Sequence, residues 1–209
     1  MIYNASLFLF VLWLNASLSL AANEISLFDG KTMGQWQNVN FGGEGQTEVY
    51  QGNIFFGDGI RLTGISWKGE PPSRMNYEIE LEARKNMGLD FFLALTVPVG
   101  DSYCTWVNGG WGGQIVGISS IDDLDAAQNE TSTYMKFAID QWYHFKMRVE
   151  PERLRCWIDK KQIIDVNIKG KKISLRPGAI SGCTPLGIAA FQTEAEFRNI
   201  IWRNLSSKN

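Results

Sequence analysis

Alternation of apolar and polar residues limits the folds open to this chain more than any other feature of its sequence. In the stretch MNYEIELEAR every second side chain is apolar, and the same holds for QWYHFKMRVE. The predicted inward faces are Tyr77, Ile79, Leu81 and Ala83 in the first stretch and Tyr143, Phe145, Met147 and Val149 in the second. Successive side chains point to opposite faces of a strand, so this period of two predicts strands with one buried and one solvated face.

Similar short stretches recur along the chain and are separated by turn residues. RLRCWID and KKQIIDVNI predict a hairpin that turns at Asp159-Lys160-Lys161, and LGIAAF and AEFRNIIWRNL predict two closing strands. EISLF, TEVYQGNIFF (broken at Gly52) and GIRLTGISW predict earlier strands. Helical periodicity is nearly absent, and Ile121–Gln128 is the one candidate for a short helix. Many short strands without strand–helix alternation favour an all-β fold, a two-sheet antiparallel sandwich of the jelly-roll type.

The first 22 residues differ from the rest of the chain. They form an uncharged apolar run that ends in the small residues Ser19-Leu20-Ala21-Ala22. This pattern predicts a secretory signal peptide over residues 1–22, followed by a single domain over residues 23–209. The expected location is therefore secreted or periplasmic. The alternative is an uncleaved membrane anchor, although the run is somewhat short to span a bilayer.

Charge and cysteine content exclude some classes of protein. The formal net charge is −2 and no basic stripe stands out, so nucleic acid is not an expected partner. The basic run Lys169–Lys172 is expected to be a solvated turn. Cys104, Cys156 and Cys183 lack the spacing of a cysteine metal site, and in an exported protein they allow one disulfide with one buried thiol.

The segment 101–131 combines glycine, tryptophan, amide and carboxylate side chains more densely than a core strand would. Glycine lets the backbone approach a ligand closely, and indole faces with amide edges suit a sugar ring. We therefore expect substrate-binding roles for Trp106, Asn108, Trp111 and Gln114. The alternative is that the tryptophans fill the core of the sandwich and the glycines form a bulge. The expected partner is a carbohydrate ligand.

The order of several motifs indicates a family. SLFDGKTMGQWQ resembles the "LFDGK-Thr-Leu-x-x-W" opening of the 3-keto-disaccharide hydrolase family, and the later strands NYEIELEAR, DFFLALTVP, QWYHFKMRV and RCWIDKKQIIDV follow the family's order. The resemblance covers roughly residues 26–205. It implies a concanavalin-like jelly roll that cleaves 3-keto-glycosides by 1,2-elimination and hydrates the resulting 2-hydroxyglucal. Segment 101–131 departs from the commoner family pattern.

Such an elimination requires a base, a group that holds the enolate oxygen, and an acid at the leaving oxygen. Candidate catalytic residues are His144 (the single histidine), Asp101 and Glu130. Glu80 and Arg84 project from one strand as a further candidate substrate-binding pair. For each residue an ordinary surface or turn role is the alternative. A divalent metal ion is a candidate cofactor that would hold the substrate oxygens.

The acidic residues Asp122, Asp123, Asp125 and Glu130 resemble the hard oxygen ligands of a calcium site. They lack the glycine and the alternating spacing of a calcium-binding loop, so a solvated acidic turn is the favoured interpretation. Two other classes remain open for the whole chain. One is a non-catalytic carbohydrate-binding module of the same fold, and the other is a structural domain in which Trp111 would be buried.

Overall fold

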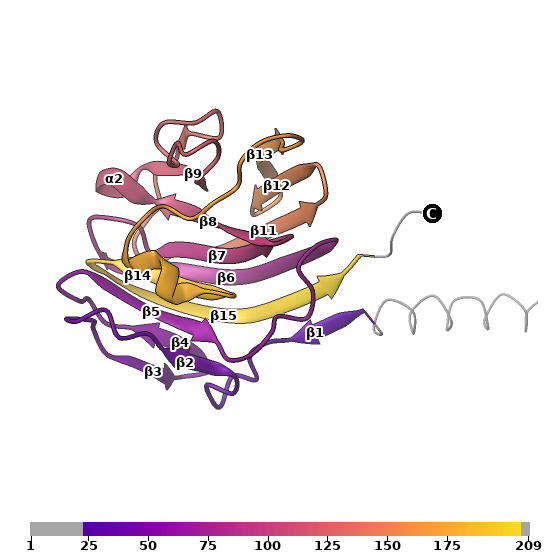
Figure 1. Cartoon of the computed structure of the whole chain (residues 1–209). Coiled ribbons are helices and arrows are strands. Elements are labelled where there is room, and N and C mark those ends of the chain that lie inside the picture. Colours follow the sequence, from indigo (N-terminus) through magenta and orange to yellow (C-terminus); the bar gives the residue numbers. More distant parts are fainter. Residues whose placement is uncertain (1–22, 206–209) are drawn as a thin grey trace, which may run out of the picture.

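The structure, a computed structural model, describes residues 23–205. The predicted signal peptide, residues 1–22, lies outside the described residues and stays a prediction. Two antiparallel sheets pack face to face (Figure 1), which confirms the predicted sandwich. Over residues 23–205, no helix has the length and apolar character needed to cross a membrane.

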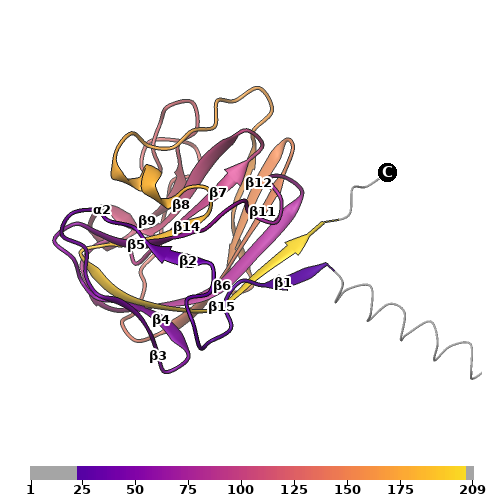
Figure 2. The ribbon, with the colours of Figure 1, turned by 60° about the horizontal axis from the view of Figure 1, so that its bottom comes forward.

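Sheet A contains eight strands among the described residues, in the order β13-β12-β11-β6-β15-β4-β3, with β1 paired to β15. Its strands are β1 (Glu24–Ser26), β3 (Thr47–Tyr50), β4 (Asn53–Phe56), β6 (Tyr77–Gly88), β11 (Trp142–Glu150), β12 (Arg153–Ile158), β13 (Lys161–Asn167) and β15 (Thr193–Asn204). The first and last strands of the domain therefore lie side by side (Figure 2).

Sheet B contains seven strands in the same part of the chain, in the order β10-β9-β8-β7-β14-β5-β2. Its strands are β2 (Trp36–Asn38), β5 (Leu62–Trp67), β7 (Leu93–Val99), β8 (Ser102–Gly109), β9 (Ile115–Ser119), β10 (Thr133–Tyr134) and β14 (Gly187–Phe191). Two short helical elements adjoin this sheet, α2 (Gly110–Gly113) and the 3₁₀ helix η1 (Ala179–Cys183).

The alternating residues of β6 and β11 face the core as predicted. Tyr77, Ile79, Leu81, Ala83, Phe145, Met147 and Val149 are fully buried, and Tyr143 is 6% exposed. The two strands pair antiparallel, which places their polar faces together on the outside of sheet A. There acidic side chains of β6 lie opposite basic ones of β11, as in the Arg148–Glu78 ion pair of 2.7 Å. Cross-strand pairs of opposite charge stabilise such a face.

The hairpin predicted between β12 and β13 is present. The strands end at Ile158 and begin again at Lys161, and Asp159 takes the left-handed backbone conformation (φ 54°) that a tight turn requires. The predicted helix over Ile121–Gln128 is wrong, because this segment consists of turns. Asp122 and Asp123 have left-handed φ values of 53° and 63°, which an α-helix cannot accommodate.

The three cysteines are free thiols, so no disulfide links Cys104, Cys156 and Cys183. All three are buried. Burial raises the pKa of Cys104 and of Cys183 to about 12 and also raises that of Cys156. Free cysteine is among the most buried residue types and here serves as a small apolar side chain.

Candidate functional site

A hollow lined largely by apolar side chains lies on the outer face of sheet B. Its volume is about 360 Å³, and we call it the cleft. The floor consists of short side chains that point away from the core on neighbouring strands, namely Ala94, Thr105, Val107 and Ser119. Thr105 also bonds to Thr96 across the strands, with 2.9 Å between the hydroxyl oxygens. Small side chains leave room above the sheet, which larger residues would fill.

Aromatic side chains form much of the cleft wall. Phe41, Phe91, Phe191 and Trp111 all line it. The Phe91 and Phe191 rings lie 5.8 Å apart between centroids, at adjoining strand ends of sheet B. Trp111 is 42% exposed, so its indole is available to a ligand. The cleft thus combines apolar rings with an accessible platform, as sites for small organic ligands commonly do.

A long connection between β13 and β14 closes one side of the cleft. Figure 1 shows it in orange, leaving β13 and crossing over β8 toward η1. Ser174 exchanges backbone hydrogen bonds with Ser120 (2.7 and 3.2 Å), which fixes the path of the connection over the sheet. Its residues 176–180 then line the cleft. Helix η1 packs closely on β14 because Gly187 has no side chain, and a Cβ there would lie 2.4 Å from the Cys183 carbonyl oxygen.

Trp111 is held at the cleft by an unusual backbone turn. The residue itself is left-handed (φ 49°), and so are its neighbours Gly109, Gly112 and Gly113. Glycine adopts such values freely, whereas a tryptophan does so at a cost. The Asp90 carboxylate stabilises the turn by accepting hydrogen bonds from the Gly112 N–H (3.1 Å) and from the Phe91 N–H (2.8 Å).

A buried lysine supports the same region from beneath. Lys85 is 6% exposed, and its ammonium donates a hydrogen bond to the Asp90 carbonyl oxygen at 3.2 Å. Burial lowers the pKa of Lys85, and the negative charge of Asp90 opposes this shift. The lysine therefore ties β6 to the loop that carries Asp90.

Three charged side chains line the cleft: Arg61, Asp90 and Arg176. The Arg176 guanidinium lies 5.7 Å from the centre of the Trp111 ring, and it pairs loosely with Asp125 at 3.9 Å. Asp90 supplies a carboxylate that can accept a proton, while a guanidinium can hold a developing oxyanion. The cleft therefore contains one candidate base and two candidate oxyanion-binding groups.

The residues predicted from segment 101–131 are divided between two faces of sheet B. Trp111 lines the cleft as expected. Trp106 and Asn108 are fully buried on the opposite, inward face, where Trp106 packs edge-on against Phe145 at 5.6 Å. Neither side chain is accessible from the cleft in this structure, so the expected substrate contact is not seen for these two residues. Gln114 is exposed at the end of α2, outside the set of residues that line the cleft.

The predicted residues on β6 and β11 lie on the outer face of sheet A, on the other side of the sandwich from the cleft. The His144 imidazole lies 3.3 Å from the Glu80 carboxylate. Burial tends to raise the pKa of Glu80, but the hydrogen bond and charge of Arg203 hold it below its ordinary value. Arg84 pairs with Glu196 at 2.7 Å. These residues form part of the ion-pair network of sheet A.

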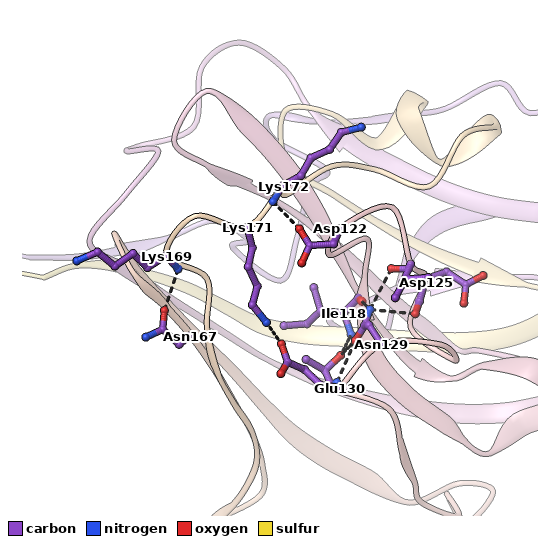
Figure 3. Close-up of polar contacts among 11 residues, drawn as sticks. Ile118, Asp122, Asp125, Asn129, Glu130, Asn167, Lys169, Lys171 and Lys172 are labelled. Atoms are coloured by element: carbon purple, nitrogen blue, oxygen red, sulfur yellow. Dashed lines mark hydrogen bonds and ion pairs between the residues drawn. The ribbon is translucent and has the colours of Figure 1, made fainter.

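The remaining predicted catalytic residues do not reach the cleft either. Asp101 is exposed in the turn between β7 and β8. Glu130 forms an ion pair with Lys171 beside the edge of β13 (Figure 3). The structure therefore places none of His144, Asp101 and Glu130 among the residues that line the cleft.

Residues 122–130 form the expected acidic turn, but it caps no helix, and its carboxylates pair with basic residues of the connection that follows β13. The Asn129 amide donates to the carbonyl oxygens of Ile118 (2.7 Å) and Asp125 (2.9 Å), as Figure 3 shows. Asp123 pairs with Lys172 at 2.8 Å. Within residues 23–205, no three histidine, cysteine or acidic side chains gather as a metal site would require.

Sequence reasoning missed Arg61, Asp90 and Arg176. Asp90 precedes the aromatic pair Phe91-Phe92 at the start of a predicted strand, which is a weak signal for a site at a strand end. The two arginines carry no local signal. Only the fold brings these positions together with Trp111.

Solved structures with the same architecture include several proteins that act on or bind carbohydrate. The Crh5 transglycosylase in complex with NAG has a TM-score of 0.59 at 12% identity, over 90% of this chain and 86% of that one. Bacillus licheniformis β-glucanase has a TM-score of 0.56 at 8% identity, over 88% and 99% of the two chains. The carbohydrate-binding module CBM66 from Bacillus subtilis has a TM-score of 0.53 at 13% identity, over 81% and 95%. At these identities the likeness establishes the fold.

The strand order and the structural matches define a two-sheet domain of the jelly-roll type. Comparison with curated protein sequences gives no significant match. The model of the 3-keto-alpha-glucoside-1,2-lyase-like domain matches residues 23–203, and the chain belongs to that family.

Proposed function

We propose that this protein is an enzyme that binds a 3-keto-glycoside in the cleft and breaks its glycosidic bond by 1,2-elimination. Family membership supports the reaction class. The observation that carries the proposal is the single carboxylate, Asp90, among the described residues that line the cleft. Hydrolysis of an ordinary glycoside generally uses a pair of carboxylates, whereas elimination next to a ketone begins with one base.

The chemistry follows from the acidity that the C3 ketone confers on C2. Asp90 accepts the C2 proton, and the electron pair moves onto the C3 oxygen as an enolate. The guanidinium of Arg61 or Arg176 holds that oxygen. When the ketone re-forms, a double bond forms between C1 and C2, the bond from C1 to the leaving oxygen breaks, and the leaving oxygen takes up a proton from protonated Asp90 or from water, which restores the carboxylate. Trp111 provides the apolar platform for the ring.

The decisive experiment compares wild type with Asp90→Asn on a 3-keto-α-glucoside. Asparagine keeps an oxygen that can accept one of the two backbone hydrogen bonds, so the Trp111 turn is preserved, but it cannot accept the C2 proton. Turnover should fall on the order of 100-fold or more, with little change in substrate affinity. Product appearance and tryptophan fluorescence titration measure the two quantities. Unchanged turnover in Asp90→Asn would contradict the role of Asp90.

The second candidate is a non-catalytic carbohydrate-binding module. The predominance of apolar side chains around the cleft favours it, as does the fold shared with a carbohydrate-binding module. This candidate predicts sugar binding that depends on Trp111, with no loss of 3-keto-glucoside over long incubation. Binding without turnover by the wild-type protein would decide for it.

A further inference from the structure

The arginines of this chain differ in whether they have an acidic partner. Among residues 23–205, Arg61 is the one arginine that forms no ion pair with a carboxylate. Arg176 has the longest ion pair of the remaining arginines, at 3.9 Å from Asp125, and its side chain is 58% exposed. Both of these arginines line the cleft. The two guanidinium groups with the weakest ion pairing to carboxylates of the protein therefore both lie at the proposed site.

The charge balance of the cleft is positive even though the chain as a whole carries a net charge of −2. Asp90 is the opposing charge, and its two carboxylate oxygens already accept backbone hydrogen bonds from Phe91 and Gly112. The Lys85 ammonium lies beneath the same loop, 3.2 Å from the Asp90 carbonyl oxygen. Because the Asp90 carboxylate is already engaged by backbone N–H groups, the positive charges of Arg61 and Arg176 remain free to attract a ligand.

We infer that the cleft selects sugars that bear an anionic substituent, a carboxylate or a sulfate, and that Arg61 and Arg176 bind this group through N–H donors that the C3 oxygen does not occupy. A guanidinium presents a planar fork of donors that matches the oxygens of such anions. Arg176 lies 5.7 Å from the Trp111 ring centre, so a sugar packed on that indole brings its substituents within reach of the guanidinium. The inference rests on the proposed function, because it names the substrate class for the same cleft.

The test uses three ligands that differ at one position. Methyl α-D-glucuronoside, methyl α-D-glucoside and its 6-sulfate are titrated into the wild-type protein, with tryptophan fluorescence or calorimetry as readout. Both anionic sugars are expected to bind on the order of tenfold more tightly than the neutral glucoside, and the advantage should shrink at high salt. Binding of the glucuronoside alone would identify carboxylate as the recognised group.

Variants then assign the effect to the two arginines. Arg61→Gln and Arg176→Gln should each reduce the preference, and the double variant should bring the affinity ratio close to one. Arg153→Gln is the matched control, because Arg153 is a half-exposed arginine on sheet A, and it should leave the preference unchanged. Equal or tighter binding of the neutral glucoside by wild type would overturn the inference and leave the proposed function intact. If none of the three sugars binds but a 3-keto-glucoside is turned over, the inference is likewise overturned and the proposed function stands. Absence of both binding and turnover would overturn the two proposals together.

Discussion

Trp111 combines a costly backbone conformation with an exposed indole, a pairing typical of a residue retained for function. Its φ of 49° favours glycine, and 42% of the residue is accessible. We expect Trp111→Gly to weaken sugar binding on the order of tenfold, because the platform is lost. The free energy of unfolding should change by less than about 1 kcal/mol, because relief of the left-handed strain offsets the lost packing.

Ligand titration and chemical denaturation of the same samples measure both effects. Trp106→Ala is the contrasting variant, because Trp106 is fully buried, and it should lose about 3–5 kcal/mol of stability. A loss of that size in Trp111→Gly would instead mark Trp111 as a structural residue.

At the residue level, the sequence indicated the right segment but not the right face. In β8, Trp106 and Asn108 alternate with Thr105 and Val107, and all four are buried. Polarity therefore could not show which pair faces the core. The exposure of Trp111 was predictable because flanking glycines deprive it of packing partners. His144 and Glu80 lie on the polar faces of their strands, but the sequence does not show whether those faces belong to the sheet that carries the cleft or to the other sheet.

The polar face of sheet A supplies a prediction at the level of paired strands. The Glu78 side chain on β6 is only 9% exposed, and Arg148 on β11 donates to it through Nε at 2.7 Å. We expect Arg148→Met to destabilise the protein by about 1–3 kcal/mol, because the mostly buried Glu78 carboxylate loses its main partner. The loss stays within this range because the Arg148 side chain is one-third exposed, so solvent already screens the ion pair.

Denaturant unfolding measures this loss. The double variant Glu78→Gln, Arg148→Met should recover much of it, because the unpaired charge is gone. Arg153→Met removes an exposed pair with Asp165, and should change stability by less than about 0.5 kcal/mol. Equal effects of Arg148→Met and Arg153→Met would show that burial of Glu78 does not matter.

Strands were more predictable than the connections between them. The period of two in β6 and β11 is local information, and so is the turn at Asp159. The segment 121–128 was misassigned because its acidic residues resemble helix caps, whereas the Asn129 side chain bonds carbonyl groups across the loop and stabilises turns instead. Such side-chain to backbone bonds compete with a helix and depend on neighbours that a pattern does not show.

At the scale of the whole molecule, the sandwich was predictable and the site was not. Residues 61, 90, 111 and 176 line one cleft although they are spread over more than half of the sequence. Each comes from a different connection or strand end, and the positions converge only through the strand order of sheet B. The order of strands depends on long-range packing, so residue types alone could not have assembled these four.

The buried thiols make the stability of the whole domain sensitive to alkaline pH. Burial raises the pKa of Cys183 from 9.0 to about 12, so the folded state keeps its proton over a range in which the unfolded chain loses it. The contribution of the protonated thiol to stability is therefore complete below pH 9 and is lost as pH rises toward 12, by about 1.4 kcal/mol per pH unit for each such group. Cys104 behaves in the same way.

Other groups also titrate in this range, so the informative quantity is a difference between variants. Cys183→Ala keeps the Cβ that packs against Gly187 and removes the titrating sulfur. Between pH 9 and 11 the unfolding free energy of Cys183→Ala should fall less steeply with pH than that of wild type. The two slopes should differ by close to the value for one proton, about 1.4 kcal/mol per pH unit, whatever the stability of the variant at neutral pH. Denaturant unfolding at a series of pH values measures both slopes. Identical slopes would mean that the Cys183 thiol ionises as readily in the folded protein as in the unfolded chain, and hence that η1 does not seal this side chain from water.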